Sequence, residues 1–237
     1  MANNYFQFKQ FTVYQQHCAM KVCTDACILG AFTSEIMNSS TANILDIGTG
    51  TGLLSLMLAQ KTMAGIDAIE MDEAAARQAK VNVQGSPWAG RIKVIHTDVL
   101  QFNSSKKYDL IISNPPFFEN DLKSTNEEKN NAKHDSSLTL LELVNAINEN
   151  LSGDGFASIL LPYHRTNYFK EISEDAGLNI HEILKIQQSP KHAFFRSIIV
   201  LAKQKGNYKE DSLLIHDDQR QYSTDFTALL KDYYLKL

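Results

Sequence analysis

A glycine-rich turn at residues 46–52 can hold a small molecule against the backbone. It reads Asp46-Ile-Gly48-Thr-Gly50-Thr-Gly52 and lies between an apolar stretch at 42–47 and a helix-like stretch at 53–60. Glycine permits tight turns, and without a side chain it lets a ligand approach the chain closely. The G-x-G-x-x-G fingerprint of nicotinamide-binding proteins would need glycine at position 53, where this sequence has leucine. The turn therefore predicts a ligand site of another kind.

Acidic residues follow the next two strand-like stretches. Glu70 lies near the end of the stretch 65–72, where one carboxylate can accept hydrogen bonds from both hydroxyls of a ribose. Asp72 is the neighbouring candidate, but its position before a helix-like stretch is typical of an N-cap, so we favour Glu70. Asp98, followed by Val99, ends the third stretch. Because parallel strands present their carboxyl ends at one edge, we expect these residues to share a site with the turn.

The tetrapeptide Asn114-Pro115-Pro116-Phe117 directly follows a fourth apolar stretch. The Asn114 side-chain carbonyl and the Pro115 backbone carbonyl can each accept one N–H of a planar amino group. Two fixed acceptors favour the pyramidal nitrogen, whose lone pair can then attack an electrophile. Prolines restrict φ and hold these oxygens in place, and Phe117 can stack on the ring that carries the amine. By itself, the same tetrapeptide could also simply end a strand and cap the core.

In combination, these features resemble the Rossmann-like S-adenosylmethionine-dependent methyltransferases. The spacing D-x-G-x-G-x-G is similar to their first motif, whose loop wraps the methionyl part of the cofactor. Asn114–Phe117 is similar to the (N/D/S)-P-P-(Y/F/W) motif of amino-methyltransferases. The resemblance implies that Asp98 and Val99 bind the cofactor's adenine and that the methyl group passes in line to an exocyclic nitrogen. The cofactor's sulfonium is already a strong electrophile, so no strong general base is required.

The N-terminal region carries a more specific resemblance. Residues 20–32, MKVCTDACILGAF, are similar to the M-K-V-G-T-D-x-x-L-L-G-A-W signature of the bacterial tRNA1(Val) (adenine-37 N6)-methyltransferases, with Cys23 and Phe32 replacing glycine and tryptophan. Segments 161–165 and 230–235 also resemble this family. The resemblance covers nearly the whole chain and implies methylation of the N6 amine of adenine 37 in tRNA1(Val). The expected cofactor-binding residues are Thr24, Asp46, Gly48, Gly50, Gly52, Glu70, Met71, Asp98, Val99 and Asn114, and the expected catalytic residues are Asn114, Pro115, Pro116 and Phe117.

A basic and aromatic strip is the expected contact surface for RNA. The stretch 185–205 contains lysines and an arginine but no acidic residue, although the whole chain has a net charge of −4. Phe194 and Phe195 lie among them and add stacking surfaces. Phosphate contacts there would make binding strongly salt-dependent, whereas the alternative is an ordinary solvated strand edge. The predicted RNA-binding residues are Lys185, Lys191, His192, Arg196 and Lys203.

Strand-like and helix-like stretches alternate from residue 42 to residue 203, which predicts an α/β fold. We expect a Rossmann-like, doubly wound sheet of seven mostly parallel strands with helices on both faces. The last two stretches, 178–188 and 194–203, have no helix between them, so one strand near the C-terminal end should be antiparallel. The polar stretch 118–137 predicts a long loop. We expect a single structural domain with an N-terminal extension packing on the cofactor site (1–40), a methyltransferase domain (41–205) and a C-terminal extension ending in a short helix (206–237).

The composition, with 43% apolar and 21% charged residues, is typical of a soluble globular protein. No run approaches the roughly 18–20 apolar residues of a membrane span, and the N-terminus lacks a signal-peptide pattern, so we expect a cytoplasmic protein. Cys18, Cys23 and Cys27 are odd in number and closely spaced, which argues against a disulfide framework. Their C-x4-C-x3-C spacing differs from the C-x3-C-x2-C motif that holds an iron–sulfur cluster in radical S-adenosylmethionine enzymes, which argues against such a cluster. We expect no metal, and a monomer without an obligate protein partner.

Three other functions are compatible with parts of this pattern. A glutamine N5-methyltransferase acting on a translation release factor would share the Asn-Pro-Pro-aromatic chemistry, because an amide nitrogen is also planar. Such enzymes usually carry a separate N-terminal helical domain, and only about 40 residues precede the glycine turn. A DNA adenine N6-methyltransferase usually needs a sizeable target-recognition domain. A cofactor-binding or RNA-chaperone module without turnover would be expected to have lost the turn or the tetrapeptide, and both are intact.

Overall fold

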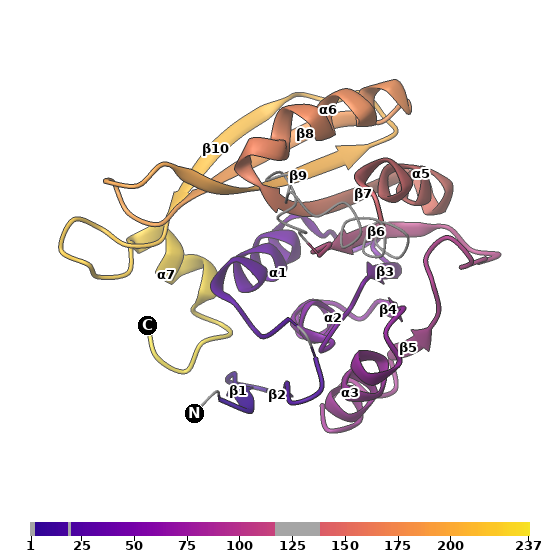
Figure 1. Ribbon diagram of the computed structural model, residues 1–237, viewed down its shortest axis with the longest axis horizontal. Helices are drawn as coiled ribbons and strands as arrows, with labels where there is room; N and C mark the ends of the chain where they lie inside the picture. Colours follow the sequence, from indigo (N-terminus) through magenta and orange to yellow (C-terminus); the bar gives the residue numbers. More distant parts are fainter. Residues whose placement is uncertain (1–2, 19, 117–137) are drawn as a thin grey trace, which may run out of the picture.

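The computed structural model describes residues 3–18, 20–116 and 138–237, and its centre is one eight-stranded sheet (Figure 1). The strand order is β10-β8-β9-β7-β6-β3-β4-β5. All neighbouring strands are parallel except that β9 runs antiparallel to both β7 and β8. In chain order the strands are β3 (Asn43–Ile47), β4 (Gly65–Glu70), β5 (Ile92–His96), β6 (Tyr108–Ser113), β7 (Leu151–Pro162), β8 (Asn179–Gln187), β9 (Phe194–Ala202) and β10 (Lys209–Leu214).

This architecture confirms the predicted doubly wound α/β fold with an antiparallel strand near its C-terminal end. The described sheet has eight strands where seven were expected, because β10 adds an edge strand from the region predicted as the C-terminal extension. β10 reads KEDSLL, and its first four residues are exposed. Its sequence gave no strand signal because an edge strand can carry charged side chains towards solvent in place of alternating apolar ones.

Helices cover both faces of the sheet (Figure 1). Each face has its own apolar core. Strand side chains alternate between the two, so that Ile44 belongs to the first core and Leu45 to the second. Burial on both faces explains why the central strands read as nearly continuous apolar runs. None of the described helices is both long and apolar enough to span a lipid bilayer. The first core is covered by α1 (Thr24–Ile36), α2 (Leu53–Ala59), α3 (Glu73–Gln84) and α7 (Thr224–Leu230), and the second by α5 (Leu140–Asn150) and α6 (Thr166–Asp175), which follows the 3-10 turn η1 (Tyr163–Arg165).

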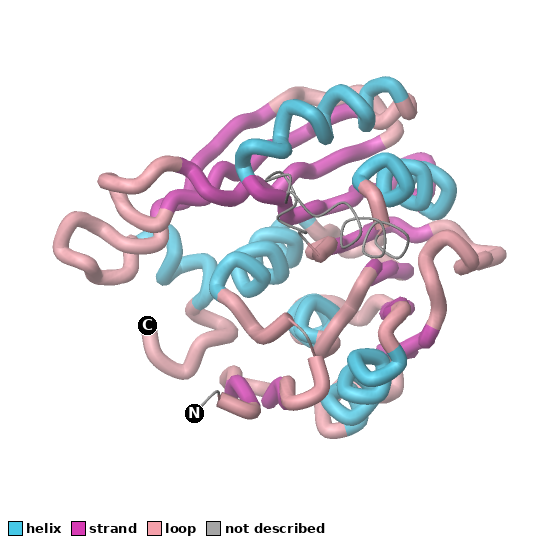
Figure 2. The backbone as a smooth tube through the Cα atoms, viewed as in Figure 1, coloured by secondary structure: helices cyan, strands magenta, loops and turns pink. Residues whose placement is uncertain are grey.

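The two ends of the chain meet on the first face, where Figure 2 shows both termini on the same side of the molecule. β1 (Tyr5–Gln7) and β2 (Thr12–Tyr14) form a small antiparallel hairpin. Directly after β1, Phe8 pairs with Tyr234 in an isolated antiparallel bridge. The Tyr233 hydroxyl donates to Ser34 Oγ of α1 at 3.1 Å. The N-terminal hairpin and the C-terminal tail therefore pack together against α1.

The contact between α1 and α2 depends on a glycine. A Cβ at Gly30 would lie 2.7 Å from Met57 Sδ and 3.2 Å from Met57 Cβ. Met57 is completely buried, so its side chain has no free space to move into. The two helices can approach this closely only because position 30 carries no side chain.

Gly30→Ala is expected to lower the free energy of unfolding by about 1–2 kcal/mol, because overpacking outweighs the roughly 1 kcal/mol by which alanine favours a helix. Urea denaturation measures this difference. Gly90→Ala is the matched control, since a Cβ there would meet no atom within 4 Å. Equal or greater stability of Gly30→Ala relative to the control would contradict the close contact.

Candidate active site

The glycine turn lies at the carboxyl edge of the sheet, between the end of β3 and α2. Gly48, Gly50 and Gly52 have φ values of +71°, +55° and +83°, in the left-handed region that favours glycine. The N–H groups of Gly48 and Thr49 donate to the Ile69 carbonyl at 2.9 and 3.0 Å, which ties the turn to β4. A Cβ at Gly48 or Gly50 would meet no atom within 4 Å. The backbone of the turn is therefore open to a ligand.

A cavity of about 400 Å³ opens in front of this turn. Its volume is in the range of small-molecule sites. The cavity is formed by the glycine turn with the start of α2, by the end of β4 with the start of α3, by residues 17, 18 and 20–22 and by the residues after β6. Among its lining residues are five of the predicted site residues, Gly48, Gly50, Glu70, Asn114 and Pro116. The structure thus brings the predicted cofactor and catalytic segments to one place.

Glu70 supports the turn from the end of β4. Its Oε2 accepts the Gly50 N–H at 2.8 Å, and its Oε1 accepts the Asp72 N–H at 2.9 Å. Asp72 caps α3, with its side chain accepting the Ala75 N–H at 2.7 Å, as its sequence position predicted. Each Glu70 oxygen has a second lone pair, so the carboxylate can still accept from the hydroxyls of a bound ribose.

Asp46 holds the turn from inside the protein. Its side chain is completely buried, and its Oδ2 accepts from Thr49 Oγ1 at 2.6 Å and from Ser55 Oγ at 2.7 Å. Its Oδ1 is buried without a hydrogen-bond partner among the described residues. Burial raises the pKa of Asp46 to about 6, although the hydrogen bonds from Thr49 and Ser55 lower it. Asp46 therefore joins β3, the turn and α2, and it does not line the cavity.

Asn114 connects the residues after β6 to the cavity. The preceding Ser113 donates its hydroxyl to the Ile47 carbonyl at 2.9 Å, which fixes the end of β6 beside β3. Asn114 Nδ2 donates to Met20 Sδ at 3.5 Å. Asn114 Oδ1 is buried and has no hydrogen-bond partner within the described part of the chain. Because a buried carbonyl without a donor is unfavourable, Oδ1 is an acceptor ready for a ligand's N–H.

The other tetrapeptide positions differ in exposure. Pro115 is buried and Pro116 is exposed. The predictions made for Phe117 and for the polar stretch 118–137 lie outside the described residues. The stacking role of Phe117 therefore stays a prediction.

Several predicted cofactor residues do not line this cavity. Met71 is half exposed, and its carbonyl hydrogen-bonds His96 Nε2 at 2.9 Å. Asp98 Oδ1 accepts the Leu100 N–H at 2.9 Å within its own turn. The predicted residues outside the cavity lining are Thr24, Asp46, Gly52, Met71, Asp98, Val99 and Pro115.

Residues 17, 18 and 20–22 form a wall of the cavity that was not among the predicted site residues. His17, Cys18, Met20, Lys21 and Val22 all line the cavity. The available signal was indirect, because the signature resemblance begins at Met20 and the N-terminal extension was expected to pack on the cofactor site. The residue types themselves give no sign of a binding role, and only the tertiary structure brings these residues to the cavity.

The three cysteines are protonated thiols at neutral pH. Burial raises the pKa of Cys18 to about 11 and those of Cys23 and Cys27 to about 12. A thiol that stays protonated is a poor nucleophile and a poor metal ligand. Among the described residues, no group of three or more His, Cys, Asp or Glu side chains is arranged to hold a metal ion.

The predicted RNA-binding residues do not form one strip. Lys185 and Arg196 lie near the end of β8 and the start of β9, at the edge where β7 ends. Lys203 follows the opposite end of β9, where its Nζ donates to the Leu151 carbonyl at 3.0 Å. The length of β9 therefore separates Lys203 from the others.

Acidic partners neutralise part of this basic region. Lys185 forms an ion pair with Glu210 of β10, and Arg196 Nε donates to Asp25 Oδ2 of α1 at 2.8 Å. The partners were not visible in the sequence stretch because they come from distant segments. Lys191 and His192 are exposed in the β8–β9 connection, with His192 Nδ1 hydrogen-bonded to Ser189 Oγ at 2.7 Å.

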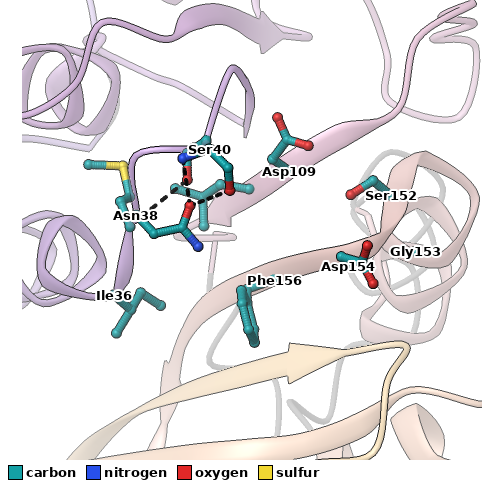
Figure 3. Close-up of a pocket in the computed structure, with 11 residues that line it drawn as sticks. Ile36, Asn38, Ser40, Asp109, Ser152, Gly153, Asp154 and Phe156 are labelled. Atoms are coloured by element: carbon teal, nitrogen blue, oxygen red, sulfur yellow. Dashed lines mark hydrogen bonds between the residues drawn. The ribbon is translucent and has the colours of Figure 1, made fainter.

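A second cavity, of about 310 Å³, lies at the opposite edge of the sheet (Figure 3). It is formed by the end of α1 and the starts of β6 and β7. There Asp109 Oδ2 accepts the N–H groups of Ala42 and Asn43, both at 2.9 Å. No predicted site residue lines this cavity, and ligands of such sheets bind at the carboxyl ends of the strands. We therefore assign the site to the cavity in front of the glycine turn.

The elevated pKa of Asp46 predicts a specific pH dependence of stability. The pKa is about 6 in the folded protein against a usual value of 3.8, so the folded state binds this proton more tightly than the unfolded chain. Ionisation of Asp46 then opposes folding, and the wild type should lose up to about 3 kcal/mol relative to Asp46→Asn as pH rises from about 4 to about 6. Urea denaturation of both proteins across this range measures the difference, and a constant difference would refute the prediction.

The proteins that resemble this chain in sequence are methyltransferases. The chain matches the family described as Methyltransferase small domain over residues 29–134. The tRNA1(Val) (adenine(37)-N6)-methyltransferase of Bacteroides fragilis is 40% identical over 240 residues and covers 100% of both chains. That of Flavobacterium psychrophilum is 38% identical over 98% of this chain and 100% of its own. That of Pectobacterium carotovorum subsp. carotovorum is 40% identical over 97% of this chain and 93% of its own.

Solved structures share the fold at much lower sequence identity. A predicted O-methyltransferase from Agrobacterium tumefaciens matches with a TM-score of 0.68 and 16% identity, over 88% of this chain and 96% of its own. A TehB-like SAM-dependent methyltransferase from Corynebacterium glutamicum matches with a TM-score of 0.52 and 18% identity, over 78% of this chain and 90% of its own. These two likenesses concern the fold alone. The full-length relatives, at 38–40% identity, show that the chain belongs to the tRNA1(Val) (adenine(37)-N6)-methyltransferase family.

Proposed function

We propose that this protein transfers a methyl group from S-adenosylmethionine to the N6 amine of adenine 37 in tRNA1(Val). The observation that carries the proposal is Asn114 Oδ1, a buried carbonyl oxygen without a partner among the described residues, on a side chain that lines the cavity of the glycine turn. The names of the full-length relatives support the same reaction. A tRNA substrate suits a cytoplasmic protein.

The residues of the cavity fit S-adenosylmethionine. The open backbone at Gly48 and Gly50 leaves room for its methionyl part, and the Glu70 carboxylate can accept from its ribose hydroxyls. When bound, the cofactor supplies a methyl group activated by a positively charged sulfur. Contacts of Asp98 and Val99 with its adenine stay a prediction.

Asn114 and Pro115 would orient the acceptor. An adenine amine is a weak nucleophile because its lone pair is delocalised into the ring. The carbonyl oxygens of the Asn114 side chain and the Pro115 backbone can each accept one N–H, which favours a pyramidal nitrogen with a localised lone pair. Burial of Pro115 and its restricted φ help to keep that carbonyl in place. The nitrogen can release its proton after the transfer, so a base is not needed beforehand.

The reaction is tested by incubating the pure protein with labelled S-adenosylmethionine and, in parallel, with tRNA lacking the modification, with a translation release factor and with DNA. We expect N6-methyladenosine when the nucleosides are analysed by mass spectrometry, and we expect it at position 37 when ribonuclease fragments of the tRNA are analysed in the same way. Label found only in protein would favour the glutamine N5-methyltransferase alternative, and label found only in DNA would favour a DNA adenine N6-methyltransferase. Either result would overturn the proposal.

Asn114→Ala should reduce kcat by about 10²–10³-fold, because it removes one acceptor that stabilises the reacting amine. Affinity for S-adenosylhomocysteine, measured by calorimetry, should change less than about threefold, since that ligand has no methyl acceptor to orient. Asn148→Ala is the matched control, because Asn148 donates to the Ala176 carbonyl on the second face of the sheet. Equal losses of kcat and affinity in Asn114→Ala would show a structural role.

The exposed connection between β8 and β9 is the proposed contact for RNA phosphates. Lys191→Ala should raise the KM for tRNA and lower the slope of log affinity against log salt by about 1. Lys203→Ala is the matched control, because Lys203 lies at the opposite end of β9 and donates to a backbone carbonyl. Equal effects of both changes on the salt slope would refute a localised contact at Lys191.

A further inference from the structure

We propose that Asn82 is a positioning residue that fixes the N-terminal wall of the cofactor cavity relative to the glycine turn. Asn82 lies near the end of α3 and does not itself line the cavity. Its side chain is only 3% exposed, although carboxamides are mostly found at the surface. Burial of such a group is tolerated when its donors and acceptor are satisfied, and the partners of Asn82 show what it connects.

The Asn82 carboxamide joins two distant backbone segments. Its Oδ1 accepts the Tyr14 N–H at 2.9 Å, and its Nδ2 donates to the Tyr14 carbonyl at 2.8 Å. Nδ2 also donates to the Thr51 carbonyl at 2.8 Å. Both N–H bonds of the amide and its carbonyl are therefore in use. The carboxamide both donates to and accepts from the Tyr14 backbone, as a neighbouring strand would. Tyr14 itself belongs to β2 and pairs with Tyr5 of β1.

On one side, the connection reaches the floor of the cavity. Thr51 lines the cavity and precedes Gly52, whose φ of +83° ends the glycine turn. A Cβ at Gly52 would lie 3.6 Å from Ala79 Cβ, so this part of the turn rests directly on α3. The hydrogen bond from Asn82 to Thr51 therefore fixes the orientation of the peptide that leads into α2.

On the other side, the connection reaches the wall formed by residues 17, 18 and 20–22. Gln15 follows Tyr14 and is 5% exposed. Its Oε1 accepts the Val22 N–H at 2.8 Å, and its Nε2 donates to the Asn3 carbonyl at 2.9 Å. Gln15 thus closes the loop that carries His17, Cys18 and Met20 over the cavity. A continuous path of hydrogen bonds and chain runs from Thr51 through Asn82, Tyr14 and Gln15 to Val22.

Loss of Asn82 would remove the partner of the Thr51 carbonyl in a buried hydrogen bond, and the partners of the Tyr14 N–H and carbonyl in two part-buried ones. Alanine removes three hydrogen bonds, and each unsatisfied group then favours a shift of the wall or of the turn. Aspartate has almost the same shape, but it would place an acceptor oxygen where Nδ2 now donates to two carbonyls. Both changes should widen or misalign the space between the wall and the turn, where the cofactor would bind.

The experiment uses S-adenosylhomocysteine binding to the full chain, because the inference rests on the proposed cofactor site but not on RNA methylation. We expect Asn82→Ala and Asn82→Asp to raise the Kd by about tenfold or more. Gln15→Ala should raise the Kd in the same direction, although it leaves the bond to Thr51 intact. Asn148→Ala, which removes a comparable bond on the other face, should lower the melting temperature without changing the Kd.

The outcomes separate the inference from the proposed function. If the wild type does not bind S-adenosylhomocysteine, the proposed function fails. If the wild type binds, and neither Asn82→Ala nor Gln15→Ala raises the Kd above that of Asn148→Ala, the positioning role is overturned. An effect of Asn82→Ala without one of Gln15→Ala would confine Asn82 to the turn and would also overturn the connection to the wall. If Asn82→Ala does not fold, Asn82→Asp, which keeps the size and shape of the side chain, is judged by the same criterion.

Discussion

The structure depends on how two carboxylates hold one glycine turn. Asp46 accepts from Thr49 and Ser55 inside the protein, and Glu70 accepts the Gly50 N–H from the neighbouring strand. A turn with three glycines in the left-handed region has many accessible conformations of its own, and these acceptors select one of them. The result is a backbone fixed in shape yet open on the side that faces the cavity.

The parallel strands explain why the chemical groups meet at this turn. β6 lies directly beside β3, so the residues after β6 emerge next to the turn after β3. Hydrogen bonding of Ser113 to Ile47 fixes that neighbourhood, and it places Asn114 at the cavity. The N-terminal segment then covers the site, tied back through Asn82. The glycine turn and Asn114 thus meet at one sheet edge, and one buried carboxamide joins the N-terminal segment to the turn.

Much of this arrangement could be predicted from local sequence. The glycine turn, Glu70 and Asn114 were identified because their chemistry is tied to strand ends, and the structure brings them together at one cavity. The seven-strand estimate missed β10, whose polar sequence is typical of a solvated edge. The basic stretch could not show that Lys185 and Arg196 face Glu210 and Asp25, because those partners come from distant segments. The role of Asn82 could not be predicted either, because the sequence does not show whether an asparagine carboxamide is buried or exposed.

The most direct measurement is a crystal structure of the protein with S-adenosylhomocysteine and an RNA fragment that carries the target adenine. The account predicts that Asn114 Oδ1 accepts the N6 amine at about 3 Å, with the Pro115 carbonyl accepting its second hydrogen. It also predicts that the ligand's sulfur lies in front of the glycine turn, in line with the lone pair of the amine nitrogen. An adenine bound beside the cofactor with the Asn114 carbonyl turned away from it would contradict the account.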